Sequence, residues 1–231
     1  MGIILNALSI ILGGFLGNLF KSRITFKNLN ILGIGIMIIS IVGFCENIFD
    51  ITQTSLKSNS LLTVVFSLIF GTAIGDFFNL ENRITNISAS LTTDFSGVID
   101  SAIFFGVGGL QLCGPIMLAL GNDNSQLILK SIIDFPFALM FGMSYGKKVV
   151  LSALPVTLCQ IFVFLGAIIS KNILAPELIK QICSIGYIIL FFSGFNLICE
   201  KKFRINNINM LMGILILLLY YIIIGLWGYI K

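Results

Sequence analysis

Residues 105–136 read FGVGGLQLCGPIMLALGNDNSQLILKSIIDFP, which is an apolar glycine-rich helix, a short polar turn and a second apolar helix. The first helix is interrupted at Cys113-Gly114-Pro115, and the second carries Lys130 and Asp134 one helical turn apart. A proline inside a helix, and ionisable side chains inside an apolar run, are costly unless a partner compensates them. We therefore expect the functional site at this helical hairpin.

The composition is that of a membrane protein. Of the 231 residues, 57% are hydrophobic and only 10% are charged, and the mean hydropathy is +1.05, whereas soluble domains carry about 25% charged residues. Apolar runs of about 20 residues, long enough to cross a bilayer, recur along the chain. We predict an all-α, polytopic integral membrane bundle that forms one domain over residues 1–231, with the lipid bilayer as partner and no nucleic-acid binding.

Several kinds of chemistry are missing from the sequence. There is no histidine, which excludes a Ser-His-Asp triad and a histidine metal site. The five cysteines have no CxxC spacing and lie in or beside apolar runs, where free cysteine behaves as a small hydrophobe. Neither an HExxH motif nor a phosphate-binding P-loop is present. We therefore expect no enzymatic activity, no metal and no cofactor.

Eight apolar segments are candidate membrane spans, and the fourth contains the break at Pro115. The segments are residues 2–20, 29–49, 60–78, 98–120, 126–146, 149–170, 178–199 and 208–229. A polar connector at 80–97 separates the first three spans (1–79) from the remaining five (98–231). The fourth and fifth segments are the most polar, so seven spans is the main alternative.

Basic residues favour one side of the predicted membrane domain. Nine lie in loops after odd-numbered spans, namely Lys21, Arg23, Lys27, Arg83, Lys147, Lys148, Lys201, Lys202 and Arg204. The other side holds only Lys57, Lys171, Lys180 and Lys231. Because positively charged loops stay in the cytoplasm, we predict that both termini lie outside.

The odd-numbered spans end in similar glycine-containing sequences, at residues 13–18, 71–76, 142–147 and 194–196. Internal duplication, which is common in transporter folds, is one explanation. The other is that small residues simply allow helices to pack closely in lipid.

The break at Pro115 predicts exposed backbone polar groups. Pro115 has no N–H, so the carbonyl of Gln111 loses its helical partner, and Gly114 allows close approach of a neighbour. An opened helix at membrane depth must face protein or a water-filled cavity. A kink that only shapes the bundle is the alternative.

Five further polar residues lie at membrane depth beside those of the break. Lys130 and Asp134 are spaced i, i+4 and can pair on one helix face, where they would mark a pathway or a binding site. The alternative is that Lys130 snorkels to the surface and Asp134 is its counter-ion. Gln160 is placed to face the hairpin or to make a plain interhelical hydrogen bond. Asn6 and Asn196 are polar residues in the first and seventh spans.

Short motifs are spread over nearly the whole chain: Gly2, Asn6, Gly13, Gly14 and Gly17; Gly114, Pro115, Met117 and Gly121; Lys130, Ser131 and Asp134; Pro155 and Gln160; Gly194 and Asn196. As a set they resemble the YqgA-like family of bacterial inner-membrane proteins, known as domain of unknown function 554. Two features depart from that family. The turn Asn122-Asp123-Asn124 is shorter, and Pro136 follows Asp134 closely where a glycine is usual.

The resemblance implies membrane transport, because the family is regarded as transporters without an assigned substrate. We predict a transporter of a small solute or ion in the bacterial inner membrane, with a homo-oligomer left open. The alternatives are a passive channel or pore, and a structural or accessory membrane protein. The predicted substrate-binding residues are Asn6, Gln111, Cys113, Gly114, Pro115, Lys130, Ser131, Asp134, Gln160 and Asn196.

Overall fold

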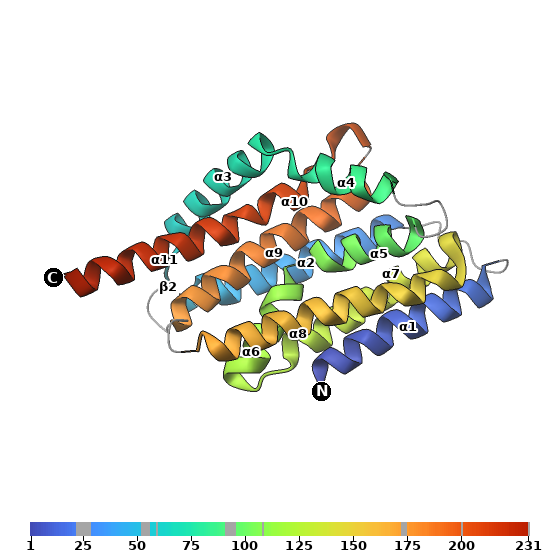
Figure 1. The fold of residues 1–231 in the computed structure, drawn as a ribbon, viewed down its shortest axis with the longest axis horizontal. Coiled ribbons are helices and arrows are strands. Elements are labelled where there is room, and N and C mark those ends of the chain that lie inside the picture. The colour runs from blue at the N-terminus through green and yellow to red at the C-terminus, as the bar shows by residue number, and fades with distance from the viewer. Residues whose placement is uncertain are drawn as a thin grey trace. The chain divides into compact units, whose positions relative to one another are not determined.

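The part of the chain that the structure describes is helical apart from its turns and one very short strand pair. Figure 1 shows the helices. The computed structural model describes residues 1–21, 29–51, 56–58, 60–90, 96–107, 109–171, 175–199 and 201–230. The strands β1 (Asp50–Ile51) and β2 (Leu56–Lys57) pair antiparallel. The helices form two compact units, unit 1 with residues 1–29 and 84–173, and unit 2 with residues 30–83 and 174–231. The predicted helical membrane fold is confirmed.

The number of membrane spans differs from the prediction when length and apolarity alone are used. Five helical segments of the described residues qualify: Gly2–Phe20, Asn30–Ile48, Ser125–Ile169, Pro176–Ile198 and Asn207–Ile224. A bent pair, Gly97–Gly106 with Leu110–Gly121, would be a sixth, and Leu61–Phe77 is a shorter apolar helix. The count of eight is therefore not confirmed.

The segment Ser125–Ile169 contains a reversal of the chain, which explains part of this difference. Asp134 and Gln160 are 26 residues apart, yet both hydrogen-bond to Asn6. A straight helix would separate them by about 39 Å, at about 1.5 Å per residue. The chain turns back at Gly146, whose φ of 77° is accessible to glycine. The segment is thus two antiparallel helices, joined by a seven-residue 3₁₀ helix that begins at Gly146.

Unit 1 consists of α1 (Gly2–Phe20), α5 (Ser96–Val107), α6 (Leu110–Gly121), α7 (Ser125–Tyr145), the 3₁₀ helix η1 (Gly146–Ser152) and α8 (Ala153–Ile169). Helix α1 packs along α7 (Figure 1) through glycines that bring the two backbones together. A Cβ at Gly17 would overlap the carbonyl of Leu139, and one at Gly142 would overlap the carbonyl of Gly14. Small residues at a crossing give this close approach in membrane proteins.

The break in the fourth predicted span lies elsewhere than expected. Helix α5 ends at Val107, α6 begins at Leu110, and the two are bent by 55°. The sequence predicts an interruption between Gly108 and Ile116, and the break lies at the start of that range; Pro115 itself lies inside α6, so its predicted position at Cys113-Gly114-Pro115 is wrong. Two consecutive glycines at 108 and 109 are poor helix formers, each about 1 kcal/mol less favourable than alanine. The proline removes one hydrogen bond of α6 without ending it.

The turn between α6 and α7 is built by its three polar residues. Asn122 adopts the left-handed conformation, with φ of 53°, and its N–H and that of Asp123 bond back to the last turn of α6. The Asp123 carboxylate then accepts from the N–H and hydroxyl of Ser125, which starts α7. Helix α7 continues through Pro136, so this departure from the family pattern leaves it unbroken.

Unit 2 consists mainly of α2 (Leu29–Ile48), α3 (Leu61–Phe77), α9 (Pro176–Ile198), η2 (Lys201–Phe203), α10 (Asn207–Met210) and α11 (Met212–Ile230). Helix α3 packs on α11 where Gly71 meets Gly213, and α2 packs on α9 where Gly33 meets Gly194. The glycine-containing span ends therefore serve close packing. Internal duplication stays a hypothesis.

The polar connector predicted at 80–97 contains α4 (Leu80–Ser90) and the start of α5. The boundary between the two units falls within α4, and each unit combines segments from before and after the connector. The assignment of the whole chain to a single membrane domain stays a prediction.

Candidate polar site in unit 1

Five polar side chains from four helices meet in the interior of unit 1. Asn6, Gln111 and Gln160 are fully buried, and Lys130 and Asp134 are only 3% and 4% exposed. All five were predicted as site residues. They come from α1, α6, α7 and α8, so the contact joins parts of the chain up to 154 residues apart.

An ion pair is the charged end of this cluster. The Lys130 ammonium lies 2.8 Å from the Asp134 carboxylate and donates to the carbonyl of Phe105 at 2.9 Å. Phe105 is in the last turn of α5, where carbonyls have no partner within the helix. The predicted burial and pairing are confirmed, and Lys130 does not snorkel to the surface. The break thus supplies a carbonyl to the lysine, but from Phe105 and not from Gln111.

A chain of amides extends from the ion pair across unit 1. Asn6 donates from Nδ2 to Asp134 at 2.8 Å, and Gln160 donates from Nε2 to Asn6 Oδ1 at 2.9 Å. The same Gln160 nitrogen donates to Gln111 Oε1 at 3.1 Å. Gln111 in turn donates from Nε2 to the carbonyl of Val156 at 2.9 Å. Gln160 therefore makes the interhelical hydrogen bonds expected of it.

The packing of α1 places Asn6 in this chain. The buried face of α1 includes Gly2, Asn6, Ile10, Gly13 and Gly17, spaced three or four residues apart as one helix face requires. The same face packs on α7 at the glycine crossing. The N–H of Gly2 also donates to the side chain of Asn124 at 2.8 Å, which ties the start of α1 to the start of α7. Asn6 is thereby held opposite Asp134.

The ion pair lies next to an aromatic cluster of α5 and α7. The rings of Phe104 and Phe137 are 4.6 Å apart between centroids, and Phe141 contacts both Phe104 and Phe105. Phe105 supplies the carbonyl that binds Lys130, and Phe137 follows Asp134 by one helical turn. Apolar surroundings strengthen a satisfied ion pair and make an unsatisfied one costly.

The other predicted site residues lie outside the hydrogen-bonded chain. Cys113, Gly114 and Pro115 are buried on α6, where Gly114 packs against the side chain of Leu127. Ser131 bonds back to the Leu127 carbonyl of its own helix and borders a shallow apolar groove between α1 and α7.

Asn196 lies in unit 2, where its side chain accepts from the N–H of Ile205 and donates to the carbonyl of the same residue. Such a pair of bonds holds the chain after α9 in a fixed turn. The structure therefore gives Asn196 a backbone-clamping role within unit 2.

Sequence reasoning missed the two main-chain acceptors of the site, the carbonyls of Phe105 and Val156. Neither has a side-chain signal. The signal available for Phe105 was the pair of glycines at 108 and 109, because two poor helix formers in a row predict a helix end, and the last carbonyls of a helix lack partners within it.

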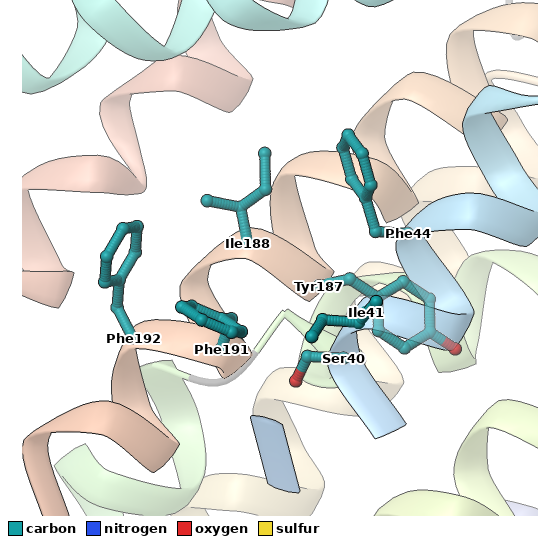
Figure 2. Close-up of a pocket in the computed structure, with 7 residues that line it drawn as sticks. All are labelled: Ser40, Ile41, Phe44, Tyr187, Ile188, Phe191 and Phe192. Carbon is teal, nitrogen blue, oxygen red and sulfur yellow. The ribbon is translucent and has the colours of Figure 1, made fainter. Parts of the chain in front are cut away.

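A cavity of about 190 Å³ in unit 2 is a second concave feature (Figure 2). It is lined by residues of α2 and α9: Ser40, Ile41, Phe44, Tyr187, Ile188, Phe191 and Phe192. The hydroxyl of Ser40 already donates to the carbonyl of Ile36. The rest of the lining is apolar or aromatic, and it contains no acidic or basic side chain that could act as a catalytic group. Among the described residues, no cluster of His, Cys, Asp and Glu could hold a metal ion.

Comparison with known proteins gives a family match over nearly the whole chain. The family model described as "Protein of unknown function (DUF554)" matches residues 1–222. The chain is 27% identical over 220 residues to "Uncharacterized membrane protein YdfK" of Bacillus subtilis (strain 168), with 93% of each chain covered. It is 23% identical over 238 residues to "Uncharacterized protein YqgA" of Escherichia coli (strain K12), with 94% of each covered. No solved structure matches the chain significantly.

Proposed function

The chain belongs to the DUF554 family, whose model covers residues 1–222, and we propose that it is a transporter of a small solute or ion in the bacterial inner membrane. The site is the buried network of Asn6, Gln111, Lys130, Asp134 and Gln160 in unit 1. The observation that carries the proposal is the ion pair at the charged end of this network, which is retained in an apolar interior.

The cost of burying the pair argues for a functional role. Taking each ion out of water costs several kcal/mol, and well-packed apolar side chains are often as stable as a buried ion pair, or more so. Ionisable residues at membrane depth therefore usually mark a binding site, a pathway or a relay. A purely packing role would need neither Lys130 nor Asp134.

The bent α5–α6 pair supports the same function. Irregular backbone at membrane depth is tolerated where protein or a cavity satisfies it, and here the freed carbonyl of Phe105 binds Lys130. Interrupted helices that meet polar side chains near the midplane are a recurring arrangement in transporters. A proton or cation that competes for Asp134 would release Lys130 from one of its two bonds. Coupling of transport to an ion gradient would act through this exchange.

The test is flux through purified protein in proteoliposomes, measured with internal dyes for protons and for sodium while candidate solutes are added outside. We expect solute-dependent proton or sodium flux in the parent protein. The double variant Lys130→Met with Asp134→Leu should abolish the flux while the protein still inserts. Ile132→Ala is the matched control on the same helix, because its side chain is 65% exposed and belongs to neither the network nor the predicted site.

Three results would contradict the proposal in different ways. Full flux in the double variant would reduce the ion pair to packing. Single-channel conductance across a planar bilayer would indicate a pore. The absence of any solute-dependent flux in the parent protein would favour an accessory role.

A further inference from the structure

The orientation of each amide in the network is fixed by an acceptor at either end. The Asp134 carboxylate only accepts, so Asn6 must turn its NH₂ group toward it. The carbonyl of Val156 also only accepts, so Gln111 must turn its NH₂ group toward that end. The oxygens of Asn6 and Gln111 consequently both face Gln160.

Gln160 must therefore present its NH₂ group to both oxygens, and it donates one hydrogen to each. Its own Oε1 is buried and has no hydrogen-bond partner among the described residues. Exchanging the oxygen and the nitrogen would place Oε1 against two other oxygens and would leave the NH₂ group unpaired. The open acceptor is thus a necessary result of the network, and buried polar groups without a partner are rare in folded proteins.

We propose that the ligand of this site is a small neutral molecule that donates an N–H or O–H hydrogen bond to Gln160 Oε1. This rests on the proposed function, because the acceptor belongs to the same network. The charges of Lys130 and Asp134 already cancel each other. A charged ligand would be buried beside this neutral set without a counter-ion, whereas a neutral donor adds only the bond that Gln160 lacks.

Gln181 in unit 2 supplies a comparison inside the same chain. It is also buried, it donates from Nε2 to the hydroxyl of Tyr221 at 3.0 Å, and its Oε1 has no partner among the described residues. A tyrosine hydroxyl can donate as well as accept. Turning the amide would therefore let Tyr221 donate to the oxygen, so the open acceptor of Gln181 requires no ligand.

Ligand binding is measured as a shift in the unfolding temperature of the detergent-purified protein, because a ligand that binds only the folded state stabilises it. The probes are two matched pairs at equal concentration. Acetamide and ethane-1,2-diol carry donors, whereas N,N-dimethylacetamide and 1,2-dimethoxyethane have the donor hydrogens replaced by methyl groups. Sodium and ammonium chloride test for a cation ligand. The proteins are the parent, Gln160→Met and the control Gln181→Met.

We expect the donor probes to stabilise the parent and Gln181→Met, and the methylated probes to have no effect. Loss of one buried hydrogen bond should weaken the binding of the donor probes to Gln160→Met about tenfold. If Gln160→Met does not fold, the inference is tested on the parent alone, by comparing the shifts in unfolding temperature with the donor probes and with the methylated probes.

Equal shifts with donor and methylated probes would overturn the inference, and so would equal shifts in Gln160→Met and the parent. If none of the probes shifts the unfolding temperature, a bound water satisfies Gln160. If only sodium or ammonium shifts it, and the shift depends on Gln160, the ligand is a cation. Either result overturns the inference of a neutral ligand. Uptake of acetamide into proteoliposomes separates this inference from the proposed function. Binding without uptake would contradict transport only, and uptake that does not depend on Gln160 would contradict the ligand only.

Discussion

The ion pair of Lys130 and Asp134 makes a specific prediction about the stability of single and double variants. Asp134→Leu removes the carboxylate that accepts from both Lys130 and Asn6. Lys130 then keeps only the carbonyl of Phe105 as a partner. The double variant Lys130→Met with Asp134→Leu removes the stranded charge as well, so it should be the more stable of the two.

The magnitudes follow from burial and from the bonds that are lost. Removing one partner of a buried pair costs about 3–5 kcal/mol, because the remaining ion stays desolvated. In the double variant the unpaired groups are the Asn6 amide and the Phe105 carbonyl, which are neutral. A neutral buried group without a partner costs about 1–3 kcal/mol, and the new apolar side chains offset part of this. We expect the double variant to be at least about 1 kcal/mol more stable than Asp134→Leu.

The measurement is equilibrium unfolding in mixed detergent micelles, with the unfolding temperature and the level of membrane-inserted protein as supporting data. Ser131→Ala should lie within about 0.5 kcal/mol of the parent, since substitutions away from buried networks have small effects. A double variant that is no more stable than Asp134→Leu would refute the reasoning. It would mean that Lys130 does not depend on Asp134 in the folded state.

Three further predictions concern packing, pH and topology. Gly17→Val should lower the free energy of unfolding by more than about 1–3 kcal/mol, the usual cost of overpacking, because its Cβ would overlap the Leu139 carbonyl. Gly166→Val is the control in the same unfolding assay and should cost much less, because nothing lies near its Cβ position. Burial raises the pKa of the Glu81 carboxyl, so its stabilisation is complete below the ordinary value of 4.5 and is lost as the pH rises through the folded-state pKa. Glu81→Gln should therefore flatten the pH dependence of unfolding from that value upward, and an unchanged profile would contradict this assignment. Reporter fusions at Lys21, Lys147 and Lys201 should give a cytoplasmic signal. An external signal at any two of them would overturn the predicted orientation.

Much of the polar network could be predicted because its side chains are conspicuous in an apolar sequence. Asn6, Gln111, Lys130, Asp134 and Gln160 each stand in a candidate span, and burial forces such groups to find partners. Asn196 has the same local signal, yet its partner is the backbone of Ile205 nine residues away. A single polar residue in an apolar run thus shows that a partner is needed without showing which one.

Helix pairing and the position of the break were harder to predict for physical reasons. The contact of α1 with α7 depends on whether two glycine faces fit, and the sequence of either helix alone leaves several partners open. The break was assigned to Pro115 because proline is the stronger single breaker. Helix α5 nevertheless ends at Val107, directly before two adjacent glycines of the sequence, and glycine is a poor helix former. The role of Phe105 then follows from where α5 ends, which no property of the phenylalanine reveals.

The glycine crossing of α1 and α7 also determines which parts of unit 1 can move. The two backbones touch near Gly13, Gly17 and Gly142 without intervening side chains, so there are no rotamers whose rearrangement would let one helix slide past the other. We expect α1 and α7 to behave as a single rigid body that carries Asn6, Lys130 and Asp134 together. Helix α5 is held against α7 at its start, where Gly97 packs on the side chain of Tyr145, whereas nothing lies near the Cβ position of Gly106 at its other end. Opening of the site would then be a hinge motion of α5, and the bond from Lys130 to the Phe105 carbonyl would be the first to break.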